Sequence, residues 1–230
     1  MQRIKIKIET LSNLFIGGLP HTFEIGGVDQ YTITDYKASP IIPASSWKGA
    51  LRSIIRDMER EKESGALRIK EGYQNYLQEL KKQNQEKEIL SKIKAESVNN
   101  LKNRMDRAIE HVSAEYLFGV QGFNLVPKLI FNDFHLKSHT SDWYSIDIKN
   151  SIEQREDKVI SNPRSYKTVR PGMVFNGEIL LWDIEKLGIE GVKEFVESAI
   201  LKFNDGRYRL GNSGSRGYGR VEIKIESECD

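Results

Sequence analysis

Residues 43–58, PASSWKGALRSIIRDM, join an extended segment to an amphipathic helix. Pro43 ends the extended segment, and Ser45 or Ser46 is a natural N-cap, because a serine hydroxyl accepts a hydrogen bond from an open N–H group of the first turn. The apolar residues that follow at helical spacing are Trp47, Leu51, Ile54, Ile55 and Met58. The stretch therefore predicts the first helix of a globular domain.

Upstream of this helix, residues 3–10, RIKIKIET, alternate charged and apolar side chains with the two-residue period of a half-buried strand. Between strand and helix, residues 17–44 hold two diglycine pairs and three prolines. Glycine and proline punctuate turns, so this segment is predicted to be a long loop with one short hairpin at most. Loops of that length usually carry function when they are ordered.

Downstream of the helix, KLIFNDFHL (128–136) and MVFNGEILLWDI (173–184) have strand character, and YGRVEIKIE (218–226) alternates like the first strand. GVKEFVESAILKF (191–203) has the apolar spacing of a second helix. The order strand, helix, strand, strand, helix, strand predicts an α+β, ferredoxin-like (RRM-like) βαββαβ core.

We expect one domain over residues 1–230, with two insertions in this core. The first, at about 60–119, is dominated by Lys, Glu, Gln and Asn and is predicted to be helical. Its narrow apolar stripe consists of Leu101, Met105, Ala108 and Val112. The second insertion, at about 137–172, is polar.

Whole-chain composition narrows the class of protein. Lys plus Arg number 35 and Asp plus Glu 33, so net charge alone does not indicate a nucleic-acid binder. No apolar run is long enough to cross a bilayer, and MQRIKIKIET lacks the continuous apolar region of a secretory signal. The single Cys229 cannot form an internal disulfide. We therefore expect a cytoplasmic protein with no membrane partner.

The helix start in IPASSWKGALRS (42–53) has the chemistry of an anion site. A helix N-terminus presents open N–H groups and a positive dipole end. Ser45, Ser46, Lys48 and Arg52 add hydroxyls and positive charge there, which suits a phosphodiester. The alternative is an ordinary serine cap beside a solvated lysine and arginine.

A second anion-friendly stretch is LGNSGSRGYGRVEI (210–223), in which Gly211, Gly214, Gly217 and Gly219 alternate with polar residues. Alternating glycines let backbone amides approach a phosphate closely, while Arg216 and Tyr218 can pair with it or stack on a base. The alternative is a plain glycine-rich turn. The stretch lacks the Gly-Lys-Ser/Thr ending of a Walker loop and the spacing of a dinucleotide fingerprint. In the predicted fold the two anion-friendly loops can lie along one groove.

These two stretches together resemble the paired signatures of the RAMP superfamily, the repeat-associated proteins of CRISPR systems. Further motifs occur in the order seen in the backbone subunits of type III-A (Csm-type) effector complexes. They are IGG (16–18), GGVDQYTITD (26–35), EYLFG (115–119), KLIFNDF (128–134), KNSIEQ (149–154) and NPR (162–164). The resemblance spans about residues 3–226. Three features depart from it: Trp47 replaces an aliphatic residue, Ala44 replaces a glycine, and residues 60–115 form a longer segment.

The resemblance implies that several copies of the chain stack, with other CRISPR effector subunits, into a helical filament along a CRISPR RNA and recognise a single-stranded target RNA. The two anion-friendly loops match the guide contacts. Residues around 150–164 match the thumb, a hairpin that displaces a base pair of the guide–target duplex at regular intervals. The RNA-binding residues implied are Gly17, Gly18, Ser45, Ser46, Lys48, Arg52, Asn150, Arg164, Gly211, Ser213, Gly214, Ser215, Arg216 and Tyr218.

Asp29 matches the catalytic aspartate of the same family, which lies beside the target phosphate that the thumb exposes. A carboxylate there can hold Mg²⁺ or another divalent cation, or orient the 2′-hydroxyl that attacks the phosphorus. The resemblance thus implies a metal-dependent endoribonuclease that leaves cyclic phosphates and binds DNA without cutting it. The residues alone favour a different interpretation, in which Asp29 after Gly26-Gly27 bonds its own backbone in an Asx turn. We assign the nearby Asp35 a structural role.

Three other functions remain open. The chain can be a non-catalytic scaffold of the same complex, or a guide-processing endoribonuclease that uses His21, since histidine is a common general acid or base. It can also be an RNA-binding module unrelated to CRISPR. His111, His135 and His139 have no metal-ligand spacing and are assigned structural or solvent-facing positions.

Overall fold

The computed structural model describes residues 2–18, 28–90, 95–137, 142–155 and 158–226. The chain divides into two compact units that alternate along the sequence. The first, which we term the helical unit, comprises Met1–Arg3, Leu51–Ile130 and Leu180–Ala199. The second, the sheet unit, comprises Ile4–Ala50, Phe131–Ile179 and Ile200–Asp230.

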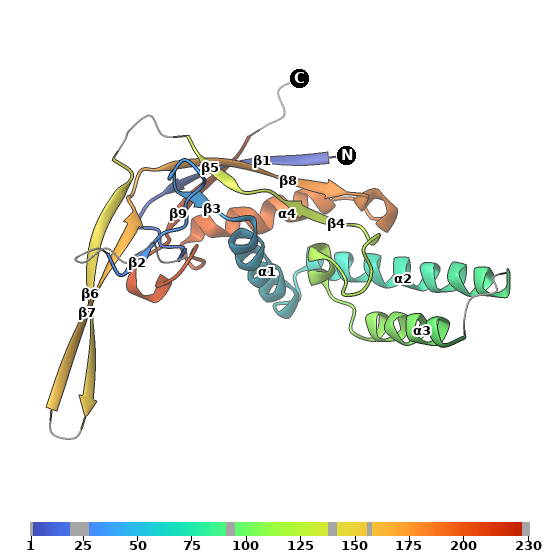
Figure 1. Cartoon of the computed structure of the whole chain (residues 1–230). Helices are drawn as coiled ribbons and strands as arrows, with labels where there is room; N and C mark the ends of the chain where they lie inside the picture. The colour runs from blue at the N-terminus through green and yellow to red at the C-terminus, as the bar shows by residue number, and fades with distance from the viewer. Residues whose placement is uncertain (1, 19–27, 91–94, 138–141, 156–157, 227–230) are drawn as a thin grey trace. The chain divides into compact units, whose positions relative to one another are not determined.

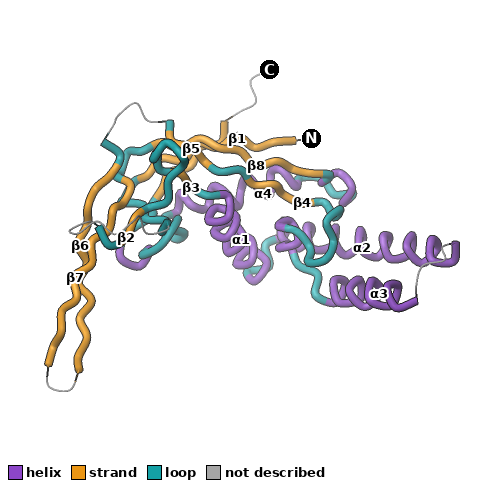
Figure 2. The backbone as a smooth tube through the Cα atoms, in the orientation of Figure 1, coloured by secondary structure: helices purple, strands orange, loops and turns teal. Residues whose placement is uncertain are grey.

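The main sheet has the strand order β3-β5-β8-β1-β9, and β4 also pairs with β8 (Figures 1 and 2). Its strands are β1 (Gln2–Thr10), β3 (Ile41–Ile42), β4 (Lys128–Phe131), β5 (Phe134–Leu136), β8 (Val174–Trp182) and β9 (Val221–Glu226). The predicted strand 128–136 is thus interrupted between β4 and β5. With helices α1 (Ala44–Arg60) and α4 (Val192–Leu201) after the first and third core strands, the structure confirms the α+β class.

The pairing of β1 with β9 follows from the alternation read in the sequence. The two strands are antiparallel, with Ile6 opposite Ile225 and Ile8 opposite Ile223. Ile4 and Ile6 are buried while Lys5 between them is exposed. Since side chains of a strand alternate between its faces, a one-residue slip would expose every isoleucine of β1.

The core of the sheet unit centres on the first turn of α1. The ring of Trp47 stacks on Phe203 with centroids 5.1 Å apart and meets Phe134 at 5.2 Å, and all three side chains are fully buried. Gly177 on β8 leaves room for this cluster, because a Cβ atom there would lie 2.6 Å from the Phe134 ring. The tryptophan that departs from the resembled family is therefore a core residue.

The second sheet has the order β2-β7-β6. Strands β6 (Tyr144–Arg155) and β7 (Lys158–Val169) form one long antiparallel hairpin, the β6–β7 hairpin (Figure 1). It occupies most of the predicted polar insertion at 137–172. The short β2 (Gln30–Tyr31) runs parallel to β7, with Gln30 opposite Tyr166.

The helical unit holds α2 (Ser64–Leu90), α3 (Ala95–Glu110) and the 3₁₀ helix η1 (Ala114–Phe118), as expected for the insertion at 60–119. Met105, Ala108 and Val112 of the predicted apolar stripe are buried, whereas Leu101 is 40% exposed, so the stripe is covered only in part. In the part of the chain described, no helix is both long and apolar enough for a membrane span.

Candidate functional site

Asp29 lies immediately before β2, and the parallel register of β2 with β7 brings it beside Ser165. Oδ2 of Asp29 accepts hydrogen bonds from the backbone N–H of Ser165 at 2.7 Å and from its hydroxyl at 2.8 Å. The hydroxyl oxygen of Ser165 in turn accepts the N–H of Asp29 at 3.0 Å. The carboxylate is exposed, and among the described residues none donates to Oδ1. Oδ2 of the carboxylate is therefore fixed by Ser165, and the described residues leave Oδ1 without a donor.

The charge state of Asp29 follows from these contacts. The backbone N–H of Ser165, then its hydroxyl, and also the nearby charge of Arg164 hold the pKa of Asp29 below its ordinary value. The group is consequently a carboxylate at neutral pH. A carboxylate of low basicity is a poor general base but a suitable ligand or hydrogen-bond acceptor.

The diglycine Gly17-Gly18 supports β2 from its other side. The N–H of Gly18 donates to the carbonyl of Tyr31 at 2.9 Å, and Gly17 bridges Thr32. A Cβ atom on Gly18 would lie 3.1 Å from the Ile33 backbone. The glycines therefore let two backbone segments approach closely beside Asp29, whereas their predicted contact with RNA stays a prediction.

The glycine-rich loop (residues 210–219) docks on the segment that follows β1. The N–H of Asn212 donates to the carbonyl of Phe15, and the N–H of Gly219 to that of Asn13, both at 2.8 Å. Gly211, at φ 73°, has no room for a side chain because a Cβ atom would lie 2.3 Å from the Phe15 oxygen. The 3₁₀ turn η4 (Gly214–Arg216) lies between these docked ends. Ser215 and Arg216 in this turn are exposed.

This docking predicts opposite effects for two glycine-to-alanine changes. Gly211→Ala should lower the free energy of unfolding by about 1–3 kcal/mol, because the new methyl group clashes with Phe15 at a positive φ. Gly49→Ala, on α1 where a Cβ would meet nothing within 4 Å, should raise it by about 0.5–1 kcal/mol. Urea unfolding of both variants measures this, and equal shifts would contradict the docking.

The middle of the β6–β7 hairpin is joined to the glycine-rich loop by Lys149, which the sequence analysis did not single out. Its Nζ lies 3.7 Å from the ring centroid of Tyr218 and 4.4 Å from that of Tyr166, and 3.2 Å from the Ser213 hydroxyl oxygen. Burial, with the nearby charge of Arg216, lowers the pKa of Lys149. The ammonium group thus holds two aromatic rings and the loop together.

Asp147 completes this junction. Its Oδ2 accepts hydrogen bonds from the hydroxyl of Tyr218 and, at 2.8 Å, from the side-chain amide of Asn13. Burial and the bond to Asp147 raise the pKa of Tyr218. The hydroxyl of Tyr218, a residue predicted from the sequence to contact RNA, therefore donates to another side chain of the protein.

The start of α1 differs from the prediction. The helix begins at Ala44, whose N–H donates to Oδ1 of Asp133 at 2.7 Å. The N–H of Trp47 donates to the carbonyl of Pro43, so Ser45 and Ser46 lie within the first turn of the helix. The prediction of a serine N-cap was wrong, because an aspartate distant in the sequence satisfies the open N–H group.

Lys48 and Arg52 lie one turn apart on α1. Nζ of Lys48 is 6.0 Å from the ring centroid of Phe131 in the sheet unit.

Asp35, also in the sheet unit, accepts the N–H groups of Lys37 and Ser39. This contact confirms the structural role assigned to Asp35.

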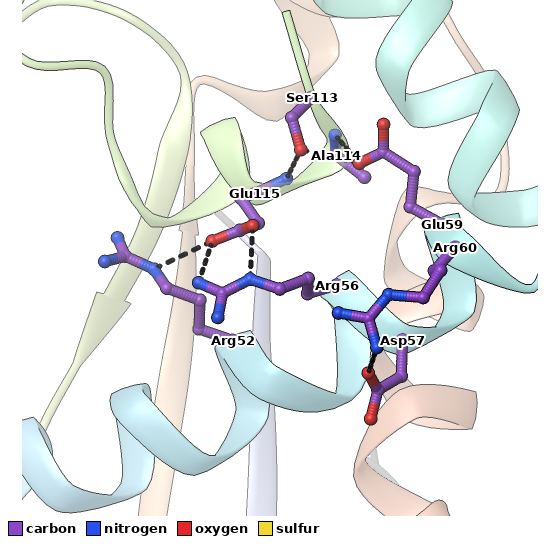
Figure 3. A network of polar contacts seen from close by, with 8 residues as sticks. All are labelled: Arg52, Arg56, Asp57, Glu59, Arg60, Ser113, Ala114 and Glu115. Atoms are coloured by element: carbon purple, nitrogen blue, oxygen red, sulfur yellow. Dashed lines mark hydrogen bonds and ion pairs between the residues drawn. The ribbon is translucent and has the colours of Figure 1, made fainter.

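In the helical unit, Arg52 belongs to a polar network around Glu115 (Figure 3). Arg56 makes two bonds of 2.8 Å to the Glu115 carboxylate, and Nε of Arg52 lies 3.8 Å from it. The guanidinium of Arg52 also lies 5.1 Å from the ring centroid of Phe118. The EYLFG motif therefore orients Arg52 through Glu115 and Phe118.

The remaining candidate residues lie as follows. Asn150 and Arg164 are exposed on the β6–β7 hairpin, where Arg164 is opposite Lys149. His21 and His139 fall outside the described residues, while His111 and His135 are exposed. Thus Asp29 and the glycine-rich loop both contact the β6–β7 hairpin, which also carries Arg164. The groove that the loop was expected to share with the start of α1 stays a prediction.

Comparisons with known proteins agree with this architecture. The chain is 28% identical over 218 residues to the CRISPR system Cms endoribonuclease Csm3 of Methanocaldococcus jannaschii, covering 94% of this chain and 76% of that protein. It is 46% identical over 54 residues to the Csm3 of Enterococcus italicus, covering 23% of this chain and 25% of that protein.

A chain in the cryo-EM structure of the Type III-B Cmr-beta bound to cognate target RNA has the same fold, with a TM-score of 0.55 at 17% identity. The match covers 97% of this chain, which spans 59% of the length of that one. The family model of the RAMP superfamily matches residues 7–222. Because this match covers nearly the whole length, the chain belongs to the RAMP superfamily.

Proposed function

We propose that this protein is a guide-RNA-binding backbone subunit of a type III CRISPR effector complex and that it cleaves complementary target RNA with Asp29. The observation that carries the proposal is the exposed carboxylate of Asp29, fixed through Oδ2 at the β6–β7 hairpin with Oδ1 left for a ligand. The likeness to two Csm3 endoribonucleases supports it. Its partners are the guide, the target RNA, further copies of the chain and other effector subunits, in the cytoplasm.

The chemistry uses the RNA's own nucleophile. The 2′-hydroxyl of the nucleotide before the cut loses its proton to water and attacks the adjacent phosphorus. The bond from phosphorus to the 5′-oxygen breaks, and that oxygen takes a proton from water. The products are a 2′,3′-cyclic phosphate and a 5′-hydroxyl. Asp29 remains ionised and orients the reacting nucleotide, since a proper approach of the two atoms lowers the barrier.

A divalent cation fits this site only if the RNA supplies most of its ligands. Among the described residues, no group of three or more His, Cys, Asp or Glu side chains could hold a metal ion, and Asp29 offers one unpaired oxygen. Mg²⁺ commonly takes one or two carboxylates and completes its shell with water and phosphate oxygens. When bound, such an ion would offset the charge that develops on the phosphate. Asp29 is the residue that would hold it.

Guide binding is assigned to the exposed turn of the glycine-rich loop, to Lys48 and Arg52 on α1, and to Arg164. These groups are expected to contact phosphates, so the affinity for guide RNA should fall steeply as the salt concentration increases. Phosphate contacts carry no sequence information, which is appropriate for a subunit that accepts many guides.

The proposal is tested with the reconstituted, guide-loaded complex and a labelled complementary RNA, in Mg²⁺ and in EDTA. We expect regularly spaced cuts in Mg²⁺ only. Replacing the 2′-hydroxyl at one cut position by hydrogen should slow cleavage at that position by at least about 100-fold, because the nucleophile is gone. Cleavage at the other positions should be unchanged. Cutting at the deoxy position would contradict the mechanism.

The rival functions give different results in the same assay. A non-catalytic scaffold binds the target without any cut in Mg²⁺. A guide-processing enzyme that uses His21 cuts free repeat RNA in EDTA and loses that activity in His21→Ala. An unrelated RNA-binding module fails to assemble with a CRISPR guide and effector subunits.

A further inference from the structure

Ser165 contacts Asp29 in a reciprocal arrangement. Its N–H and its hydroxyl both donate to Oδ2 of Asp29, at 2.7 and 2.8 Å, and its hydroxyl oxygen accepts the Asp29 N–H at 3.0 Å. These contacts fix the main chain and the carboxylate of Asp29 together. Nothing in the sequence pattern marks Ser165, which lies 136 residues away from Asp29.

The hydroxyl of Ser165 is not needed to dock β2. The N–H of Thr32 already donates to the carbonyl of Lys167 at 3.1 Å, and the N–H of Gly18 donates to Tyr31 on the other side at 2.9 Å. The backbone N–H of Ser165 would also remain in any substitution except proline. What the hydroxyl adds is an acceptor for the Asp29 N–H and a second bond to one oxygen of the carboxylate, which together set the direction of the carboxylate.

We propose that Ser165 is a positioning residue for Asp29: it holds Oδ2 so that Oδ1 faces the reacting nucleotide. This inference rests on the proposed function of Asp29. An exposed aspartate with no such partner samples several rotamers, and small misplacements of a reacting group reduce rates strongly.

The proposal has a signature of its own. A group that only orients Asp29 acts on the rate constant of cleavage and not on target affinity. A residue that holds the hairpin together would change both.

The test compares single-turnover target cleavage by guide-loaded complexes containing wild-type protein, Ser165→Ala or Ser165→Thr. We expect Ser165→Ala to lower the rate constant about tenfold to hundredfold with target affinity retained. Ser165→Thr keeps the hydroxyl and should restore the wild-type rate constant.

Ser145→Ala is the matched control, because Ser145 also pairs its hydroxyl within the base of the hairpin, with Thr168 at 2.9 Å. Its rate constant and its target affinity should equal those of wild type. A Ser165→Ala complex that cuts like wild type, while Asp29→Ala does not cut, overturns the role of Ser165 alone. An assembled wild-type complex that makes no cuts overturns the function of Asp29 and this inference together.

Discussion

Asp29→Ala is expected to reduce target-RNA cleavage by at least about 100-fold while leaving guide and target binding intact. The carboxylate is exposed and charged, and its only described partner is Ser165. Removing the carboxylate therefore takes away the group that orients the reacting nucleotide. Because the side chain is exposed, its removal opens no cavity. Cleavage is measured in single-turnover assays on the guide-loaded complex, and binding by titration with an uncleavable target.

Two further variants separate charge from structure. Asp29→Asn keeps an oxygen that can accept both bonds from Ser165 but removes the charge, so it should be nearly as inactive as the alanine variant. Asp142→Ala removes another exposed carboxylate of the sheet unit, paired with Arg170 at 2.8 Å, and should cut normally. Full activity in Asp29→Asn would assign the carboxylate to holding the loop, as in an Asx turn.

Trp47→Ala is expected to have the largest effect on stability. The side chain is fully buried between Phe203 and Phe134, so truncation loses aromatic contacts and leaves a large cavity. Comparable core truncations cost about 3–5 kcal/mol. For a chain of this size that corresponds to a fall in Tm of roughly 10 °C, which differential scanning calorimetry measures.

Trp47→Leu should cost clearly less than Trp47→Ala, because leucine fills part of the space between the two phenylalanine rings. Trp143→Ala is the matched control, since Trp143 is only half-buried and its ring lies 6.2 Å from that of Tyr144. A loss in Trp143→Ala as large as in Trp47→Ala would show that burial in the core is not what sets the cost.

Periodicity was sufficient where an element is amphipathic. The alternation in residues 3–10 predicted β1, and the spacing of Trp47, Leu51 and Ile54 predicted the buried face of α1. The same reasoning included Leu101 in the apolar stripe of α3, although this side chain is exposed. A pattern places a residue on one face of an element, but the neighbouring elements decide how much of that face is covered.

The candidate site depended on a different kind of information. Asp29 was singled out by its resemblance to a family, because a lone aspartate after two glycines is otherwise typical of a turn. The alternating glycines had already marked the glycine-rich loop. Ser165 has no local signal at all, and Lys149 has none beyond its place in the KNSIEQ motif. Their roles arise from the pairing of β6, β7 and β2, which places them beside Tyr218 and Asp29.

The order of the elements, the α+β class and the buried faces of the first strand and first helix were predictable, because they depend on the spacing of neighbouring residues. Which side chains meet depends instead on how distant segments pack. Asp133 caps α1 and Ser165 holds Asp29, across 89 and 136 residues of chain. Such contacts depend on strand register, which is set when distant strands pair and leaves no mark in a local pattern.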